Sequence, residues 1–205
     1  MKGLLLKDLL GFSNQGKLYV LIIAAYGVFS YLGKSVSMFA IMITLFGVMY
    51  VITAMALDEK FNWYKYALSM PVSRNDMVIS KYLLGVVFTV ITFVLNIIMN
   101  FVISPGDIAK AVYESLPFVG IAFVYLSVIL PILFKFGVEK GRIPMLAAIF
   151  IPVILFVMIA KSNIQIDWLN EKLINSLIPF SPFVILIIMI LSVLLSCKIF
   201  NKKEF

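Results

Sequence analysis

The chain has 205 residues, of which 63% are hydrophobic and only 13% are charged, and its formal net charge is +7. A soluble globular protein contains about 45–50% apolar and about 25% charged residues, so a soluble fold of this chain would expose large apolar patches. The composition therefore indicates an integral membrane protein. A single cysteine excludes an internal disulfide, and the absence of histidine disfavours a structural zinc site.

Residues 1–16 are expected to form an interfacial helix that leads into the first span. Leu5, Leu9 and Phe12 share one helical face, and Lys7 and Asp8 lie away from it. Such a helix would lie in the membrane interface with its apolar face toward the lipid. It would either anchor the chain there or take part in force transmission, and the residues favour neither role.

Six charge-free stretches are long enough, or nearly long enough, to cross a bilayer as helices. About 20 apolar residues span the hydrocarbon core, and no segment alternates with the period of two that a barrel strand shows. We therefore expect an all-α integral membrane protein that forms a single transmembrane domain, 1–205. The expected spans are residues 18–33, 35–57, 82–106, 115–134, 143–160 and 173–200, and the charge-free part of the last ends at 197.

The positions of Lys and Arg predict the orientation of these spans. With six crossings, 13 of the 17 Lys and Arg residues lie on one side, in the two terminal segments and in 58–81 and 135–142. The other four are Lys34, Lys110, Lys161 and Lys172. Because basic residues remain in the cytoplasm, both termini are expected there, in the cytoplasmic membrane. The net charge then reflects topology and contact with anionic lipid, and we expect no nucleic-acid partner.

Gly33, Lys34 and Ser35 match the end of the phosphate-binding motif G-x-x-x-x-G-K-[ST]. The first glycine of that motif would stand at position 28, which is Val28, and the triplet lies on the outside in this topology. The sequence also lacks a paired-carboxylate, Ser/His or metal constellation. We therefore expect neither catalysis nor a cofactor in this chain.

The segment between the second and third spans is rich in aromatic residues. Phe61, Tyr64 and Leu68 are spaced for one helical face, and Asp58 and Glu59 are expected in the first turn of that helix, where the helix dipole favours anions. An apolar face on a cytosolic segment fits two roles equally well on physical grounds. It is either a membrane-surface anchor or a docking surface for another protein.

A break is expected in the middle of the same segment, 58–81. Pro71 disfavours helical geometry at Met70, so the first helix should stop there. Ser73 and Asp76 resemble a capping box that opens the third span, with Asp in place of the usual Glu or Gln. The pattern predicts a helix–break–helix elbow.

The motif D-E-K-x-x-W-x-x-Y-x-x-S-x-P-x-S-R, followed by V-x-x-K-Y, resembles the elbow of small ABC-2-type transporter permeases. The residues that occupy it are Asp58, Glu59, Lys60, Trp63, Tyr66, Ser69, Pro71, Ser73, Arg74, Val78, Lys81 and Tyr82. The opening Met1–Lys7 is similar to the start of that family, and the span layout resembles it over the whole chain.

This resemblance implies a function and a set of partners. The elbow would be the coupling helix, seated in a groove on a separate ATPase subunit that carries ATP and Mg. Two such ATPase subunits and a second permease, identical or homologous, would complete the transporter. The implied contact residues are Glu59, Phe61, Trp63, Tyr64, Tyr66 and Arg74. The family also implies a short helix in the last extracellular loop, 161–177.

A small and polar stripe runs along the third span at helical spacing. Its members are Gly85, Thr89, Thr92, Asn96 and Asn100. Such residues are usually buried against other helices, and the alternative is a polar wall of a translocation path.

The sequence as a whole favours the permease subunit of an ATP-driven exporter of an amphipathic or hydrophobic cargo, a peptide being one candidate. One alternative is a non-transporting immunity or assembly protein whose elbow anchors it to lipid. An ion-coupled secondary transporter is disfavoured because no ionisable residue lies in the middle of any expected span.

Overall fold

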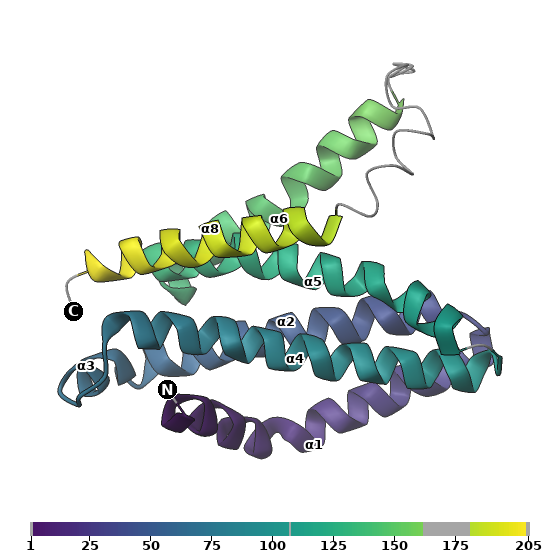
Figure 1. Ribbon diagram of the computed structural model, residues 1–205, viewed down its shortest axis with the longest axis horizontal. Coiled ribbons are helices and arrows are strands. Elements are labelled where there is room, and N and C mark those ends of the chain that lie inside the picture. Colours follow the sequence, from purple (N-terminus) through teal and green to yellow (C-terminus); the bar gives the residue numbers. More distant parts are fainter. Residues whose placement is uncertain (1, 107, 162–180, 204–205) are drawn as a thin grey trace.

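The computed structural model describes residues 2–106, 108–161 and 181–203, and within these ranges every regular element is a helix. The all-helical fold expected from the sequence is therefore confirmed for this part of the chain (Figure 1). The helices are α1 (Lys2–Gly33), α2 (Val36–Lys60), α3 (Trp63–Leu68), α4 (Arg74–Ile103), α5 (Ile108–Phe136), α6 (Val138–Lys161) and α8 (Ser181–Asn201). The short helix expected between the last two spans lies outside the described residues.

Five described helices are long and apolar enough to cross a membrane. They contain the segments Gly16–Gly33, Val36–Lys60, Arg74–Ile103, Ile108–Phe136 and Ser181–Asn201. α6 is a continuous helix over the expected span 143–160, and the total of six crossings stays a prediction. The expected interfacial helix and the first span form one continuous helix, α1.

The first two helices are joined by a tight turn. Lys34 adopts a left-handed conformation with φ of +48°, and Ser35 is extended at the N-cap of α2. The hydroxyl of Ser30 donates a hydrogen bond of 2.7 Å to the carbonyl of Ser35, which closes the turn. α1 and α2 are therefore antiparallel neighbours.

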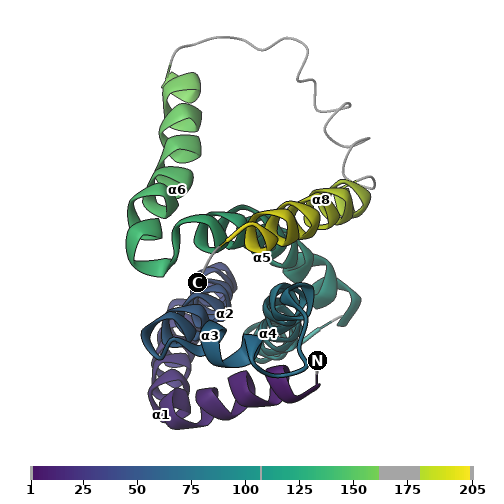
Figure 2. The same cartoon turned by 90° about the vertical axis from the view of Figure 1, so that its left-hand side faces the viewer.

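The helices pack in layers around the central pair of α2 and α4. α1 lies along one side of this pair and α5 lies along the other, with α8 packed on α5 and α4 (Figures 1 and 2). Fully buried side chains from three helices form the centre, among them Val51, Val78, Leu84 and Leu130. α6 packs on α5 and α2 and leans away from the rest of the bundle (Figure 1).

A hydroxyl network joins α4 to α5 and α8 within this core. The Tyr82 hydroxyl lies 2.6 Å from the Ser192 Oγ and 2.8 Å from the Ser196 Oγ. Ser192 in turn donates to the carbonyl of Ser127 at 2.6 Å. Polar contacts of this kind are a common way to join helices in lipid, where apolar packing alone has little directional preference.

The first and last helices bury little of their apolar surface. Only 6% of the residues in Gly16–Gly33 and 17% of those in the most apolar part of Ser181–Asn201 are buried within the chain, against 56% in the most apolar part of Val36–Lys60. Such broad apolar faces require lipid or another subunit as a neighbour. The two ends of the described chain lie at the same end of the bundle as α3 (Figure 1). That end, which holds residues 58–81, is called the elbow end below.

Candidate functional site

The elbow consists of the end of α2, a left-handed turn, α3 and a break before α4. Asn62 has φ of +51° and reverses the chain between α2 and α3. α3 ends at Leu68, two residues before the predicted end at Met70. The predicted capping box is confirmed, since the backbone N–H of Asp76 donates to Ser73 Oγ at 3.1 Å and the Asp76 carboxylate accepts from the Ser73 N–H.

The predicted position of the two acidic residues is wrong. Asp58 and Glu59 lie in the last turn of α2, which continues to Lys60, and not in the first turn of the elbow helix. The C-terminal end of a helix disfavours anions, so these carboxylates need partners elsewhere. Both find them on other helices, as described below.

The inward face of α3 packs on the C-terminal helix. Ala67 is fully buried, and the ring of Tyr64 meets that of Phe200 edge to face with centroids 5.3 Å apart. Phe200 also packs edge to face on Phe134 of α5 at 5.4 Å. Burial, followed by the charges of nearby carboxylates such as Asp58, raises the pKa of Tyr64 well above its ordinary value. Tyr64 is therefore a neutral packing residue.

The elbow exposes three large apolar side chains, beside the exposed polar residues Asn62, Lys65 and Ser69. Phe61 is 65% exposed, Tyr66 is 63% exposed and Met70 is 49% exposed. The shared face predicted for Phe61, Tyr64 and Leu68 is not formed, because Phe61 lies in the turn before α3 and helical spacing does not extend to it. The three exposed side chains, Phe61, Tyr66 and Met70, are called the outer face of the elbow.

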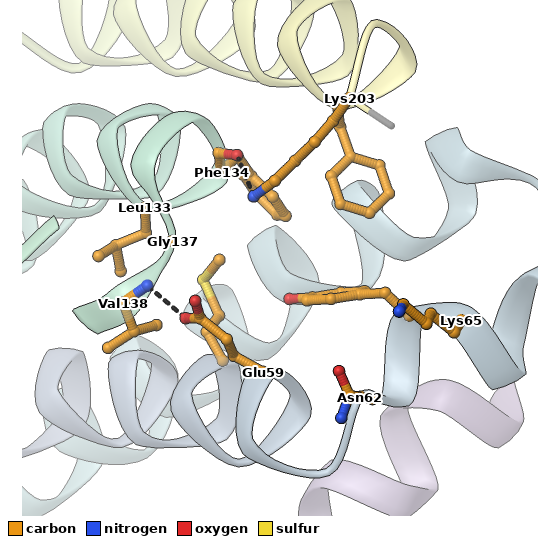
Figure 3. A pocket seen from close by; sticks show the side chains of 11 residues that line it. Glu59, Asn62, Lys65, Leu133, Phe134, Gly137, Val138 and Lys203 are labelled. Carbon is orange, nitrogen blue, oxygen red and sulfur yellow. Dashed lines mark hydrogen bonds between the residues drawn. The ribbon is translucent and has the colours of Figure 1, made fainter. Parts of the chain in front are cut away.

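Glu59 binds the start of α6. Its carboxylate accepts a hydrogen bond from the backbone N–H of Val138, the first residue of that helix (Figure 3). Gly137 precedes it with φ of +78°, and a Cβ there would lie 2.5 Å from Glu59 Oε1. The helix dipole and a free N–H both favour a carboxylate at this position. Glu59 thus ties α2 to the turn between α5 and α6.

Arg74 ties the start of α4 to the end of α8. Its Nη1 donates to the carbonyls of Asn201 at 2.8 Å and Lys203 at 3.0 Å. The side chains of Asn201 and Asn75 add a hydrogen bond of 2.9 Å between the same two segments. A cation at the C-terminal carbonyls of a helix is stabilising.

A pocket of about 140 Å³ lies between the elbow, the α5–α6 turn and the C-terminal segment. Glu59, Asn62 and Lys65 line its elbow side, and Gly137 and Lys203 line the opposite side (Figure 3). The Lys203 ammonium donates to the carbonyl of Phe134 at 3.2 Å. The pocket walls are therefore already joined by internal hydrogen bonds, at Glu59 and at Lys203.

Four charged residues meet at the elbow end, where α1, α2 and α4 come together. Lys81 lies 2.7 Å from Asp8 and 2.6 Å from Asp58, and Lys7 pairs with both Asp8, at 3.2 Å, and Asp58. The side chains of Asp8, Asp58 and Lys81 are 4%, 7% and 4% exposed. This set of four, Lys7, Asp8, Asp58 and Lys81, is called the ionic cluster. Its two cations and two anions balance, as buried charges require.

The sequence does not predict the ionic cluster. Lys7 and Asp8 are expected away from the apolar face of α1, and in the structure Asp8 is buried with Leu4, whereas Leu9 is 38% exposed. In lipid the apolar side can face outward, because only the charges need protein partners. The sequence does contain one signal for the cluster. Asp8 stands between apolar residues of a helix that meets lipid, where its charge needs a partner within the protein.

The polar stripe of α4 is buried inside the chain. Thr89, Thr92, Asn96 and Asn100 are each at most 6% exposed. A Cβ on Gly47 of α2 would lie 2.9 Å from Thr92 Cγ2, which shows how closely α2 and α4 approach. The stripe therefore packs against neighbouring helices in this conformation. Within the part of the chain that the structure describes, Asn96 Oδ1 has no hydrogen-bond partner.

Of the six contact residues implied by the resemblance, two point outward. Phe61 and Tyr66 are exposed, whereas Trp63 and Tyr64 pack against the buried apolar core of the bundle. Glu59 and Arg74 bind other helices through the hydrogen bonds given above. All six residues lie at the elbow end, but two of them are exposed and the other four contact the rest of the bundle.

The fold and the elbow together define a multi-pass helical membrane protein with a structured loop between its second and third helices. The chain matches the family described as ABC-2 family transporter protein over residues 3–201 and therefore belongs to it, as an ABC-2-type transporter permease. Comparison with curated proteins and with solved structures found no match. A permease of this family is a transmembrane component of a transporter.

Proposed function

We propose that the chain is the permease subunit of an ATP-driven exporter and that the outer face of its elbow docks on a separate ATPase subunit. The observation that carries this proposal is a pair of exposed aromatic side chains on a loop whose inward side packs on α8 and binds α6. Exposed aromatic side chains such as Phe61 and Tyr66 are typical anchors of protein interfaces.

The attachment of the elbow to the bundle supports a mechanical role. Glu59 binds α6, Tyr64 packs on α8, Arg74 binds the end of α8, and Lys7 of α1 lies 4.4 Å above the ring of Trp63. A displacement of the elbow by an ATPase subunit would therefore move several helices together. Rigid-body movement of packed elements is a common form of switching between states.

The transporter would contain two ATPase subunits, which carry ATP and Mg, and a second permease subunit, identical or homologous. The exposed apolar faces of α1 and α8 suit contact with lipid and with that second permease. The excess of Lys and Arg at the elbow end favours a cytoplasmic elbow and cytoplasmic termini, in the cell membrane. This orientation presents the elbow to a cytosolic ATPase.

We propose an amphipathic or hydrophobic cargo, with a hydrophobic peptide as one candidate. The support is the uncharged character of the polar stripe, since Thr89, Thr92, Asn96 and Asn100 offer hydrogen bonds without charge. The stripe would line a path only after the helices separate. The test is ATP hydrolysis by the purified complex, which should rise on addition of amphipathic peptides. No rise with any such peptide would contradict the proposed cargo.

Co-purification tests the docking proposal. The chain is co-expressed with candidate ATPase subunits as wild type and as the variant Phe61→Ala/Tyr66→Ala. The matched control is Phe183→Ala/Tyr113→Ala, which removes side chains that are 65% and 67% exposed on α8 and α5, away from the elbow. We expect the elbow variant to lose the ATPase and the control to keep it.

Two results would contradict the docking proposal. Equal retention by all three proteins would place the ATPase contact elsewhere. Retention of no ATPase by correctly inserted wild type would favour the non-transporting reading, in which the elbow anchors the protein to lipid.

A further inference from the structure

The ionic cluster holds a helix that has few other buried contacts. Of the α1 side chains whose burial the structure describes, only Leu4, Asp8 and Ser30 are buried. Leu4 and Asp8 lie at the elbow end, and Ser30 lies at the opposite end beside the turn to α2. At the elbow end α1 is therefore held by buried Leu4, by half-buried Leu5 and by the charge pairs of Lys7 and Asp8.

The cluster also connects α1 directly to the elbow. Lys7 pairs with Asp58 in the last turn of α2 and lies over the ring of Trp63 in α3, 4.4 Å from its centroid. Lys81 bridges Asp8 and Asp58 from α4, just after the elbow in the chain. The hydroxyl of Tyr50 donates to the backbone carbonyl of Asp8. A movement of α3 thus reaches α1 through Lys7 without passing through the core of the bundle.

A cleft lies beside this connection, between α1, the C-terminal part of α2 and the elbow. It has a volume of about 460 Å³ and is lined by Lys7, Gly11, Tyr50, Leu57 and Phe61, among others. This open space lies between α1 and the residues of α2 and the elbow that the cluster joins to it. A buried charge network has few alternative arrangements, because a charge that leaves its partner in this environment is strongly disfavoured. Lys7, Asp8, Asp58 and Lys81 therefore give α1 one defined position relative to the elbow.

We infer that the ionic cluster is the link through which the elbow moves α1, with Lys7 and Asp58 as the positioning residues of that link. This inference rests on the proposed function, since it supposes that an ATPase displaces the elbow. α1 carries a wide apolar face that meets lipid or the second permease, so its movement changes the outer surface of the transporter. The cluster acts by position and takes part in no chemical step.

The test measures the position of α1 in the full complex with the ATPase subunit in lipid nanodiscs. Cys197→Ser removes the native thiol, and spin labels are placed at Leu6→Cys on α1 and Phe136→Cys at the end of α5, both exposed positions. Distances are measured by double electron–electron resonance with and without ATP and vanadate. The trapped state should shift the distance between the labels when the cluster is intact.

The variant Lys7→Met/Asp58→Asn removes one cation and one anion and keeps the Asp8–Lys81 pair. We expect it to retain the ATPase and to hydrolyse ATP, but to lose the shift between the labels. The matched control is Lys110→Met/Glu114→Gln, which removes another cation–anion pair, 3.9 Å apart in α5, and should keep the shift. If the cluster only stabilised the fold, its loss would lower ATP hydrolysis and the movement of α1 together.

A second measurement does not depend on the ATPase. A thiol at Leu4→Cys, a position that is 9% exposed, is labelled with a membrane-impermeant maleimide. Loss of the Lys7–Asp58 pair should speed labelling roughly tenfold, which corresponds to about 1.4 kcal/mol of opening free energy. If wild type binds no ATPase, the proposed function fails and this rate decides whether the cluster holds α1.

Three results would overturn the inference. The first is an unchanged labelling rate in the Lys7→Met/Asp58→Asn variant. The second is an ATP-dependent shift between the labels that is the same with and without the pair, or absent in wild type although the complex forms. The third is loss of ATPase binding in the variant, which would make the cluster part of the docking site.

Discussion

Replacement of Gly137 by alanine should break the contact between Glu59 of the elbow and the start of α6. Gly137 has φ of +78°, a region that residues with a Cβ rarely adopt. The new Cβ would lie 2.5 Å from Glu59 Oε1 and 3.2 Å from Glu59 Cδ. The carboxylate must then move, and it loses the hydrogen bond from the Val138 N–H.

The expected loss of stability has two parts. Left-handed geometry costs an alanine about 1–2 kcal/mol relative to glycine. A hydrogen bond to a charged group contributes about 1.5–3 kcal/mol, and most of it is lost when Glu59 is displaced. Gly137→Ala should therefore lower the free energy of unfolding by about 2.5–5 kcal/mol. In a Glu59→Ala background only the backbone cost remains, so the same substitution should cost about 1–2 kcal/mol.

Wild type, Gly137→Ala, Glu59→Ala and the double variant form a double-mutant cycle. Their free energies of unfolding are measured in mixed detergent micelles by tryptophan fluorescence. Gly33→Ala is the matched glycine control, because Gly33 ends α1 and a Cβ there has nothing within 4 Å. We expect it to change stability by less than about 0.5 kcal/mol. Costs of Gly137→Ala that are equal with and without Glu59 would refute the proposed clash.

Three further predictions concern the elbow and the helix contacts around it. Ser73→Ala should cost about 1 kcal/mol through loss of the α4 cap, measured by the same titration; a change near zero would contradict the cap. Gly47→Ala should cost about 1–3 kcal/mol because its Cβ would lie 2.9 Å from Thr92 Cγ2, and Thr92→Ser should relieve it; no relief would mean that another contact causes the loss. Neutral Tyr64 contributes stability that is complete below its ordinary pKa of 10.0 and is lost as the pH rises toward the raised pKa of the folded state, so Tyr64→Phe should lose less stability than wild type in that range. Equal alkaline unfolding curves for both proteins would contradict this assignment.

Local features of the elbow could be predicted from the sequence because their partners are close along the chain. The Ser73–Asp76 capping box joins residues three positions apart, and Pro71 marks the break between the two helices. The long apolar helices were also predictable, since a span depends on the composition of one continuous segment. These features fix the elbow as a structured loop.

The internal contacts of the elbow were not predictable because their partners are distant. Lys81 and Asp8 are 73 positions apart, and Glu59 and Val138 are 79 positions apart. A lysine near the end of a span looks the same whether it faces anionic lipid or a buried carboxylate. For this reason the sequence marks Lys81 only as a topology signal and as part of the family motif, with no partner inside the chain, and the resemblance places Glu59 at a partner subunit.

The most direct test of the docking role is site-specific photo-crosslinking. A benzoyl-phenylalanine replaces Tyr66 on the outer face of the elbow or, as the control, Tyr113 on α5, two side chains of similar exposure, 63% and 67%. The proposed function predicts a crosslink to the ATPase subunit from position 66 and none from position 113. A crosslink from position 113, or none from position 66 in a complex that contains the ATPase, would contradict it.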